Sequence, residues 1–364
     1  MLISPVRFTR RALLAAALPA PAFAAVGGAA AERAAVAPAL TRPALVARRA
    51  EGAVLLAAAK AGPRLVAVGE RGLVLASDDD GVTWRQQPTP VSETLTAVRF
   101  VDARRGAAVG HGGLVLRTDD AGARWRVVLD GREAARLALE AAHAAGRGED
   151  IALAERLVAE GADKPFLDLQ MPDASTLVVV GAYGLAFASS DGGQRWAAWL
   201  DRFDNPKALH LYALRQRGEQ WLAAGEQGLL LQSTDGGRRF RRLASPYRGS
   251  FFVAELLDER TFVVAGLRGH LWRSADAGRS WTQVAAPPSA SITASFTASL
   301  RTPEGGLLFA NQAGFVMKLA ADRLEPMHEH ALPPINGLVL GERGRLTALT
   351  LTGAVPLPLA AVAK

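Results

Sequence analysis

A tyrosine and an acid are the best candidates for catalysis in this chain. Of its three tyrosines, Tyr183, Tyr212 and Tyr247, Tyr212 lies in an apolar segment whose counterpart in the next repeat carries Glu255. A tyrosine nucleophile beside an acid can cleave a glycosidic bond when arginines hold an anionic sugar. No arginine precedes Tyr212 or Tyr247 in a context suited to such a clamp. A carbohydrate-binding or sialidase-like glycosidase therefore remains the alternative function.

Other reaction types have less support. The chain has no cysteine, which excludes disulfides, thiolate metal ligands and a cysteine nucleophile. Among six histidines only His328 and His330 are close in sequence, and two ligands are too few for a zinc site. The Gly-x-x-Gly motifs recur between apolar segments and do not precede a helix, as a phosphate loop would. The sequence thus predicts no catalytic residues, no metal and no cofactor.

The residues of the chain are organised by a repeat. Each unit reads apolar segment, Gly-x-x-Gly, apolar segment, then Ser/Thr-x-Asp-x-Gly-x-x-Trp/Phe. The last element, the Asp-box, occurs as Ser77/Asp79/Gly81/Trp84, Thr118/Asp120/Gly122/Trp125, Ser189/Asp191/Gly193/Trp196, Ser233/Asp235/Gly237/Phe240 and Ser274/Asp276/Gly278/Trp281. The Asp carboxylate can accept N–H bonds within its own tight turn, and Gly permits a positive φ. We expect the aromatic ring to pack between neighbouring sheets.

The number of repeats predicts an all-β, seven-bladed β-propeller over residues 38–364. The second glycine of Gly-x-x-Gly marks each unit: Gly72, Gly113, Gly184, Gly228, Gly269, Gly314 and Gly353. Units of about 40 residues fit four short strands, as a propeller blade requires. The last two units lack the Asp-box, and the seventh ends after its third strand. We expect the segment from Pro38 to Val46 to supply the missing strand and close the ring.

One interval between repeats is longer than the others, at 71 residues. Its extra residues, 131–163, are rich in Ala, Leu, Glu and Arg and contain no proline, and Ile151, Ala154, Leu157 and Val158 recur on one helical face. The pattern predicts a helical hairpin inserted between the second and third blades. It leaves from the Gly-x-x-Gly face and could cover that face as a lid.

Repeated Gly-x-x-Gly motifs, most of them followed by an Asp-box, resemble the Ycf48/Hcf136-like family of photosystem II assembly factors and their relatives. The resemblance covers about residues 40–360, whereas the Asp-box alone is shared with other BNR-repeat proteins. It implies a non-enzymatic propeller that helps to assemble or stabilise a membrane complex. The helical insert and the two degenerate units depart from the family pattern.

Two groups of residues are candidate sites. The turns of the Gly-x-x-Gly motifs are expected to ring the channel, with these polar members: Glu70, Arg71, His111, Tyr183, Glu226, Gln227, Arg268 and Gln312. They could bind a ligand or peptide, or be polar only because they are solvated.

The second group consists of arginines in or beside the Asp-boxes: Arg85, Arg124, Arg126, Arg195, Arg238, Arg239, Arg241, Arg242 and Arg279. On the opposite face and rim they could attract acidic protein surfaces or lipid headgroups. Alternatively, they protect the outer strand of each blade from edge pairing. An arginine patch is also the partner surface that the resemblance implies.

The N-terminus is typical of a secretion signal. Arg7, Arg10 and Arg11 precede an apolar run and the small-residue sequence Ala22-Phe23-Ala24. We predict a signal peptide over residues 1–24, using the twin-arginine or the general route, and a linker over 25–37. Without the three signal arginines the net charge of +7 falls to about +4, which does not favour nucleic acid.

These observations predict a monomeric protein, periplasmic or otherwise exported and soluble after signal cleavage. Its expected role is that of an assembly, stability or accessory scaffold, and its expected partner is an envelope membrane protein or complex.

Overall fold

The computed structural model describes residues 38–146, 148–285 and 294–357, so the predicted signal peptide and linker lie outside the described residues. Seven antiparallel sheets follow one another along the chain. They comprise β1–β4 (Leu55–Ala61, Arg64–Gly69, Val74–Ser77, Arg85–Gln87), β5–β8 (Leu95–Phe100, Gly106–Gly110, Leu114–Thr118, Arg126–Leu129), β9–β12 (Phe166–Gln170, Leu177–Gly181, Ala186–Ser189, Ala197–Ala198), β13–β16 (Leu211–Arg217, Gln220–Gly225, Leu230–Ser233, Arg241–Arg242), β17–β20 (Phe251–Leu256, Phe262–Gly266, Leu271–Ser274, Thr282–Gln283), β21–β24 (Phe296–Arg301, Leu307–Asn311, Val316–Ala320, Arg323–Pro326) and β25–β27 (Ile335–Leu340, Leu346–Thr350, Gly353–Leu357).

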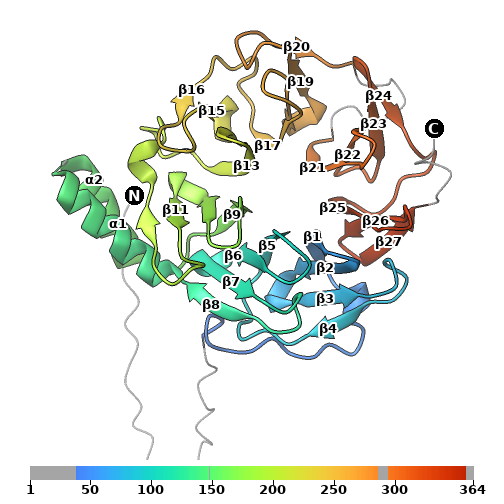
Figure 1. The fold of residues 1–364 in the computed structure, drawn as a ribbon, viewed down its shortest axis with the longest axis horizontal. Helices are drawn as coiled ribbons and strands as arrows, with labels where there is room; N and C mark the ends of the chain where they lie inside the picture. The colour runs from blue at the N-terminus through green and yellow to red at the C-terminus, as the bar shows by residue number, and fades with distance from the viewer. Residues whose placement is uncertain (1–37, 147, 286–293, 358–364) are drawn as a thin grey trace, which may run out of the picture. The chain divides into compact units, whose positions relative to one another are not determined.

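The sheets form a closed ring, which confirms the seven-bladed propeller (Figure 1). The first strand of each sheet packs against the first strand of the next, and β25 packs against β1. The core therefore lies between neighbouring sheets. Large apolar side chains such as Phe187, Phe240 and Phe262 are fully buried there, and this burial is the main stabilising contribution.

Short 3-10 turns join the second and third strands of the first five sheets: η2 (Glu70–Gly72), η3 (His111–Gly113), η4 (Ala182–Gly184), η6 (Glu226–Gly228) and η7 (Leu267–Gly269). The middle residue of each turn is left-handed, as at Arg71 with φ 55° and Tyr183 with φ 56°. The Asp-box turns join the third and fourth strands at the other end of the sheets. They hydrogen-bond to the turns that follow the innermost strands, as from the Gly192 N–H to the Ser175 oxygen at 2.8 Å.

The predicted helical hairpin is confirmed as α1 (Gly131–Ala145) and α2 (Gly148–Glu160). Asp130 caps α1 by accepting the N–H groups of Arg132 and Glu133. The hairpin does not act as a lid over the channel, because α1 packs against β12, the outermost strand of the third sheet. In Figure 1 both helices lie at the outer edge of the ring. Alanines such as Ala134 and Ala138 allow this close packing on the sheet.

The prediction that the segment from Pro38 to Val46 completes the last sheet is wrong. The seventh sheet has three strands, and the segment bonds instead to the first sheet and its following loop. The Ala44 N–H donates to the Thr89 oxygen at 3.2 Å, and the Ser92 N–H donates to the Ala39 oxygen at 2.8 Å. The ring closes through contacts between innermost strands, including a 2.9 Å hydrogen bond from Asn336 Nδ2 to the Leu55 oxygen.

Three Asp-box tryptophans show how the boundary between the seventh and first sheets differs from the boundaries between other neighbouring sheets. The indole Nε1 of Trp196 donates to the Val128 oxygen of the preceding sheet at 2.9 Å, and Trp281 donates to the Ala244 oxygen at 3.1 Å. Trp84 lies between the first sheet and the three-stranded seventh sheet, and its buried Nε1 has no hydrogen-bond partner among the described residues. The predicted position of the rings between sheets is thus confirmed for Trp196 and Trp281. Of the four tryptophans only Trp125 is fully in the core.

Replacing Trp196 by phenylalanine should therefore be costlier than the same change at Trp84. Both changes remove similar ring area, but only Trp196→Phe breaks a hydrogen bond, worth about 1 kcal/mol, while Trp84→Phe removes an unsatisfied donor. Urea unfolding of both variants measures the difference. Equal losses in the free energy of unfolding would contradict the view that the indole hydrogen bond stabilises the boundary at Trp196 but not the one at Trp84.

Candidate functional site

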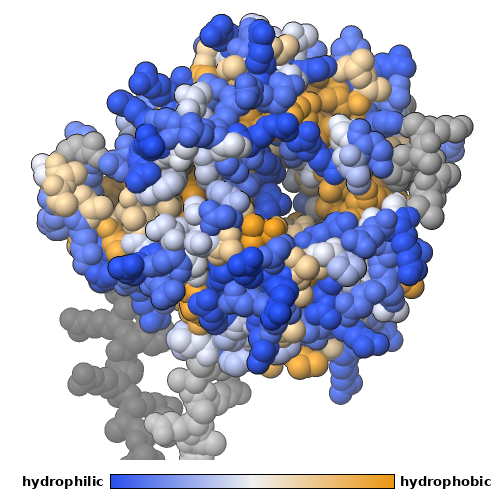
Figure 2. All heavy atoms as spheres, in the orientation of Figure 1, coloured by the Kyte–Doolittle hydropathy of each residue, from blue (hydrophilic) through white to orange (hydrophobic). Residues whose placement is uncertain are grey.

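The nine arginines predicted from the sequence, which we call the arginine surface, are all exposed. They lie in Asp-box turns or at the start of the outermost strands β4, β8 and β16. On the face drawn in Figure 2 most of the surface is hydrophilic, and hydrophobic side chains lie beside the central opening.

The Asp-box geometry positions these arginines through its carboxylate. In the third sheet Ser189 Oγ donates to Asp191 and accepts the Gly193 N–H at 2.8 Å, which closes the turn. Asp191 also accepts the backbone N–H and the Nε of Arg195, both at 2.9 Å. These hydrogen bonds, the backbone one above all, lower the pKa of Asp191 to about 2. The turn therefore carries a permanent negative charge that neutralises its own arginine.

Two other arginines of the surface also pair with a carboxylate, and six do not. Arg124 pairs with Asp120 at 2.7 Å and Arg126 with Asp119 at 3.5 Å. Within the described part of the chain no ion pair involves Arg85, Arg238, Arg239, Arg241, Arg242 or Arg279.

Four of these unpaired arginines belong to the fourth sheet and flank one buried ring. Phe240 is fully buried and stacks on Phe203 with centroids 4.0 Å apart, which anchors the turn. Arg238 and Arg239 precede the ring, and Arg241 and Arg242 follow it as β16. The one Asp-box carboxylate here, Asp235, is held by Ser233 Oγ and by the N–H groups of Arg238 and Arg239. With four arginines and one Asp-box carboxylate, this turn and strand carry a net positive charge.

The channel-face candidates lie one strand away from the channel wall. Their turns join the second and third strands, while the innermost strands form the wall. All eight are exposed except Glu226, which is half-buried. Whether they bind a ligand stays a prediction.

Tyr183 and Glu226 of this group belong to one cluster, which is centred on His210. The His210 Nδ1 accepts the Tyr183 N–H at 2.9 Å, and the two rings meet edge to face at 4.9 Å. Glu226 accepts the His210 backbone N–H, and Tyr212 continues the cluster towards Phe252. Desolvation raises the pKa of Tyr212, which keeps its hydroxyl protonated and opposes a role as nucleophile.

The structure does not bring Tyr212 and Glu255 together. Strand pairing shows that Tyr212 matches Phe252, so Glu255 lies three residues further along its strand, or about 10 Å away. Glu255 instead pairs with Arg215 at 3.6 Å and accepts the Ser299 hydroxyl.

His328 is also occupied by structural contacts. Its Nε2 accepts the Val316 N–H at 3.0 Å, and its Nδ1 bonds to the His330 oxygen at 2.8 Å. Among the described residues no three His, Cys, Asp or Glu side chains are grouped so that they could hold a metal ion.

Sequence reasoning missed an ionic ladder along the channel wall. Arg99 on β5, Asp168 on β9, Arg215 on β13 and Glu255 on β17 link four successive sheets. Asp168 pairs with Arg99 at 3.2 Å and with Arg215 at 2.5 Å. A charged residue at the centre or near the end of each largely apolar innermost strand was the available signal, although β13 carries a second one, Arg217.

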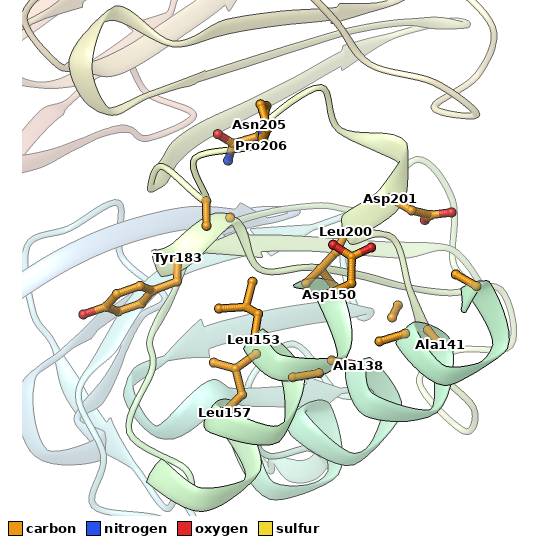
Figure 3. A pocket seen from close by; sticks show the side chains of 16 residues that line it. Ala138, Ala141, Asp150, Leu153, Leu157, Tyr183, Leu200, Asp201, Asn205 and Pro206 are labelled. Atoms are coloured by element: carbon orange, nitrogen blue, oxygen red, sulfur yellow. The ribbon is translucent and has the colours of Figure 1, made fainter. Parts of the chain in front are cut away.

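A small apolar pocket separates the helical hairpin from the third sheet. It has a volume of about 210 Å³. Figure 3 shows Ala138, Leu153 and Leu157 of the hairpin on one side, and Leu200 and Pro206 of the chain after β12 on the other. Asp150, Asp201 and Tyr183 also line this pocket, which could accept at most a small apolar group.

Comparisons with known proteins agree with the fold. The family model described as photosynthesis system II assembly factor YCF48 matches residues 156–314. A structure of YCF48 bound to D1 peptide has a TM-score of 0.61 and 14% identity, covering 86% of this chain and 97% of that chain. YCF48 from Cyanidioschyzon merolae has a TM-score of 0.61 and 14% identity, covering 84% and 95%.

The WD40 propeller domain of Doa1 has a TM-score of 0.62 and 9% identity, covering 89% of this chain and 98% of that domain. None of the curated proteins matches this chain significantly. At such low identities the structural similarities show the fold alone, and the link to a family comes from the model match within the propeller. The model match lies within the propeller and agrees with the resemblance to the YCF48 photosystem II assembly factors that the repeats predicted.

Proposed function

We propose that this protein is an exported, non-enzymatic propeller that binds a membrane protein or complex of the cell envelope and assists its assembly or stability. The unneutralised arginines of the fourth sheet are the observation that carries the proposal. Four guanidinium groups on one anchored turn and edge strand can bind carboxylates in a bidentate manner. They favour an acidic surface or loop as the partner.

Three further findings support a binding role. Within the described residues no helix is long and apolar enough to cross a membrane, so membrane attachment through such a helix has no support there. The family of the matching model consists of assembly factors, and one solved YCF48 structure is a complex with a D1 peptide. The tyrosine and acid that catalysis would require are held apart in packed positions.

Charge reversal at the fourth sheet tests the proposal. A variant with Arg238, Arg239, Arg241 and Arg242 changed to Glu should lose a membrane-protein partner that the wild type recovers from gently solubilised envelopes. The loss is expected because the reversed surface would be negative and would repel the acidic surface of the partner. The wild-type interaction should also weaken with added salt, which screens the charges. The measurement is affinity isolation with identification of the recovered proteins.

A matched control reverses four exposed cations in connections that end at the other face. These are Arg48, Arg49, Lys207 and Arg248. This control should recover the same partner as the wild type. If both variants lose it equally, or if the wild type recovers no membrane protein, the arginine surface is not the binding site that we propose.

A further inference from the structure

The channel is not filled evenly. A cavity of about 690 Å³ opens on one side of it, near the end where the Asp-box turns lie. Its lining comes from β1, from the ends of β21 and β25 with the turns that follow these two strands, and from Arg99 of β5.

The innermost strands explain why the cavity is on this side. Strand pairing identifies one matching residue in each of the seven sheets: Ala59, Arg99, Gln170, Arg215, Glu255, Leu300 and Val339. Four successive sheets carry long polar side chains at this level, and three of them, Arg99, Arg215 and Glu255, belong to the ionic ladder together with Asp168. The other three carry Ala59, Leu300 and Val339, which are short or apolar and all line the cavity.

The cavity also carries an excess of positive charge. Arg99 is balanced by Asp168 in the ladder, and Lys60 lies 3.7 Å from Glu342. Arg301 also lines the cavity and forms no ion pair among the described residues. Among the described residues its guanidinium donates to the Leu256 and Leu257 oxygens alone, both at a long 3.4 Å. One cation is thus available beside an apolar wall.

We propose that this cavity binds a short aliphatic carboxylate. The carboxylate would accept hydrogen bonds from Arg301, whose weak contacts to carbonyl oxygens leave it free to turn towards an anion. The hydrocarbon chain would cover Ala59 and Leu300. The volume lies within the range of small-molecule sites, which combine apolar walls with a few polar groups. This site is separate from the arginine surface. The protein would therefore bind a small ligand in addition to the partner proposed above.

Calorimetric titration of the purified protein with hexanoate tests the proposal. The wild type should bind hexanoate, and Arg301→Gln should weaken binding about tenfold or more, as expected for the loss of a charge-assisted hydrogen bond. Ala59→Leu should weaken binding by filling the cavity without changing a charge. Arg260→Gln is the matched control, because Arg260 is an exposed arginine in the turn after β17 and does not line the cavity. It should bind as the wild type does.

Three results would overturn the site. They are no binding of hexanoate by the wild type at millimolar concentration, equal binding of the neutral hexanamide, or unchanged binding by both Arg301→Gln and Ala59→Leu. Urea unfolding of each variant verifies that it is folded. Failure here leaves the envelope partner test unaffected, because no residue of the arginine surface is changed.

Discussion

Asparagine in place of Asp168 should lower the free energy of unfolding by about 3–5 kcal/mol, the cost of removing one partner from a buried ion pair. The side chain of Asp168 is 6% exposed and bridges Arg99 and Arg215. Asparagine keeps the shape but loses the charge, so both guanidinium groups keep their desolvation cost without their shared counter-ion. Urea unfolding at neutral pH measures the loss.

Asp78→Asn is the control for this prediction. Asp78 accepts two hydrogen bonds from Arg64, at 2.6 and 2.9 Å, but its side chain is 63% exposed. Water screens such a pair, so its loss should cost less than about 1 kcal/mol. Similar losses from the two variants would show that the ladder is no more important for stability than a surface pair.

The effect of Asp168→Asn should also depend on pH. Burial alone would raise the pKa of Asp168, but the charges of Arg99 and Arg215 and two backbone N–H bonds outweigh it and lower the pKa below its usual range. A lowered pKa in the folded state adds stability above the unfolded value of about 4, and this stability is lost as the pH falls through the folded pKa. The difference in the free energy of unfolding between wild type and Asp168→Asn should therefore become smaller below about pH 4. A gap that widens in acid would contradict this sign.

Local rules made the blades predictable. The Ser77, Asp79 and Gly81 turn is closed by bonds among neighbours in sequence, so the same residue types recur wherever the turn is needed. The helical insert was equally predictable from its composition and periodicity. These features depend on residues a few positions apart, which a sequence pattern can show directly.

Ring closure and the ionic ladder of the channel wall depend on contacts between residues that are far apart in the sequence. Sequence patterns did not predict these contacts. Leu45 and Val46 have the composition of a strand, yet these residues are 83% and 87% exposed. Hydrogen bonds with the Gln86 side chain, to the Leu45 oxygen and from the Ala47 N–H, hold this segment against the first sheet. The ladder was missed for a similar reason, since its charges lie in four separate repeats and meet only when the ring is closed.

The arginine surface was found from the sequence, but its charge balance was not. Arg195 and Arg238 occupy similar turns, yet Arg195 pairs with its own Asp-box carboxylate while Arg238 forms no ion pair in the described chain. Side-chain geometry decides which arginines keep a free charge. The fourth sheet therefore became the focus of the proposed partner site only after its contacts were known.

Gly228→Ala should be among the most damaging substitutions in this protein, with a loss of several kcal/mol, because it places a side chain where the backbone of the repeat is crowded. Gly228 ends the turn between β14 and β15 with φ +77°, and a Cβ there would lie 2.1 Å from the Tyr247 oxygen. Relief of this clash requires movement of the connection to the next sheet. Ser245 Oγ, at 2.9 Å, would be displaced as well.

Gly236→Ala separates the clash from the backbone strain. Gly236 lies in the Asp-box turn of the same sheet with φ +74°, and a Cβ there would meet nothing within 4 Å. The left-handed backbone alone should cost about 1–2 kcal/mol. The free energies of unfolding of the two variants, measured in urea, should then differ by the cost of the contact with the Tyr247 oxygen. If both variants lose the same free energy of unfolding, the segment that carries Tyr247 moves away from the new Cβ at no cost. Gly228 is then required only for its left-handed backbone conformation.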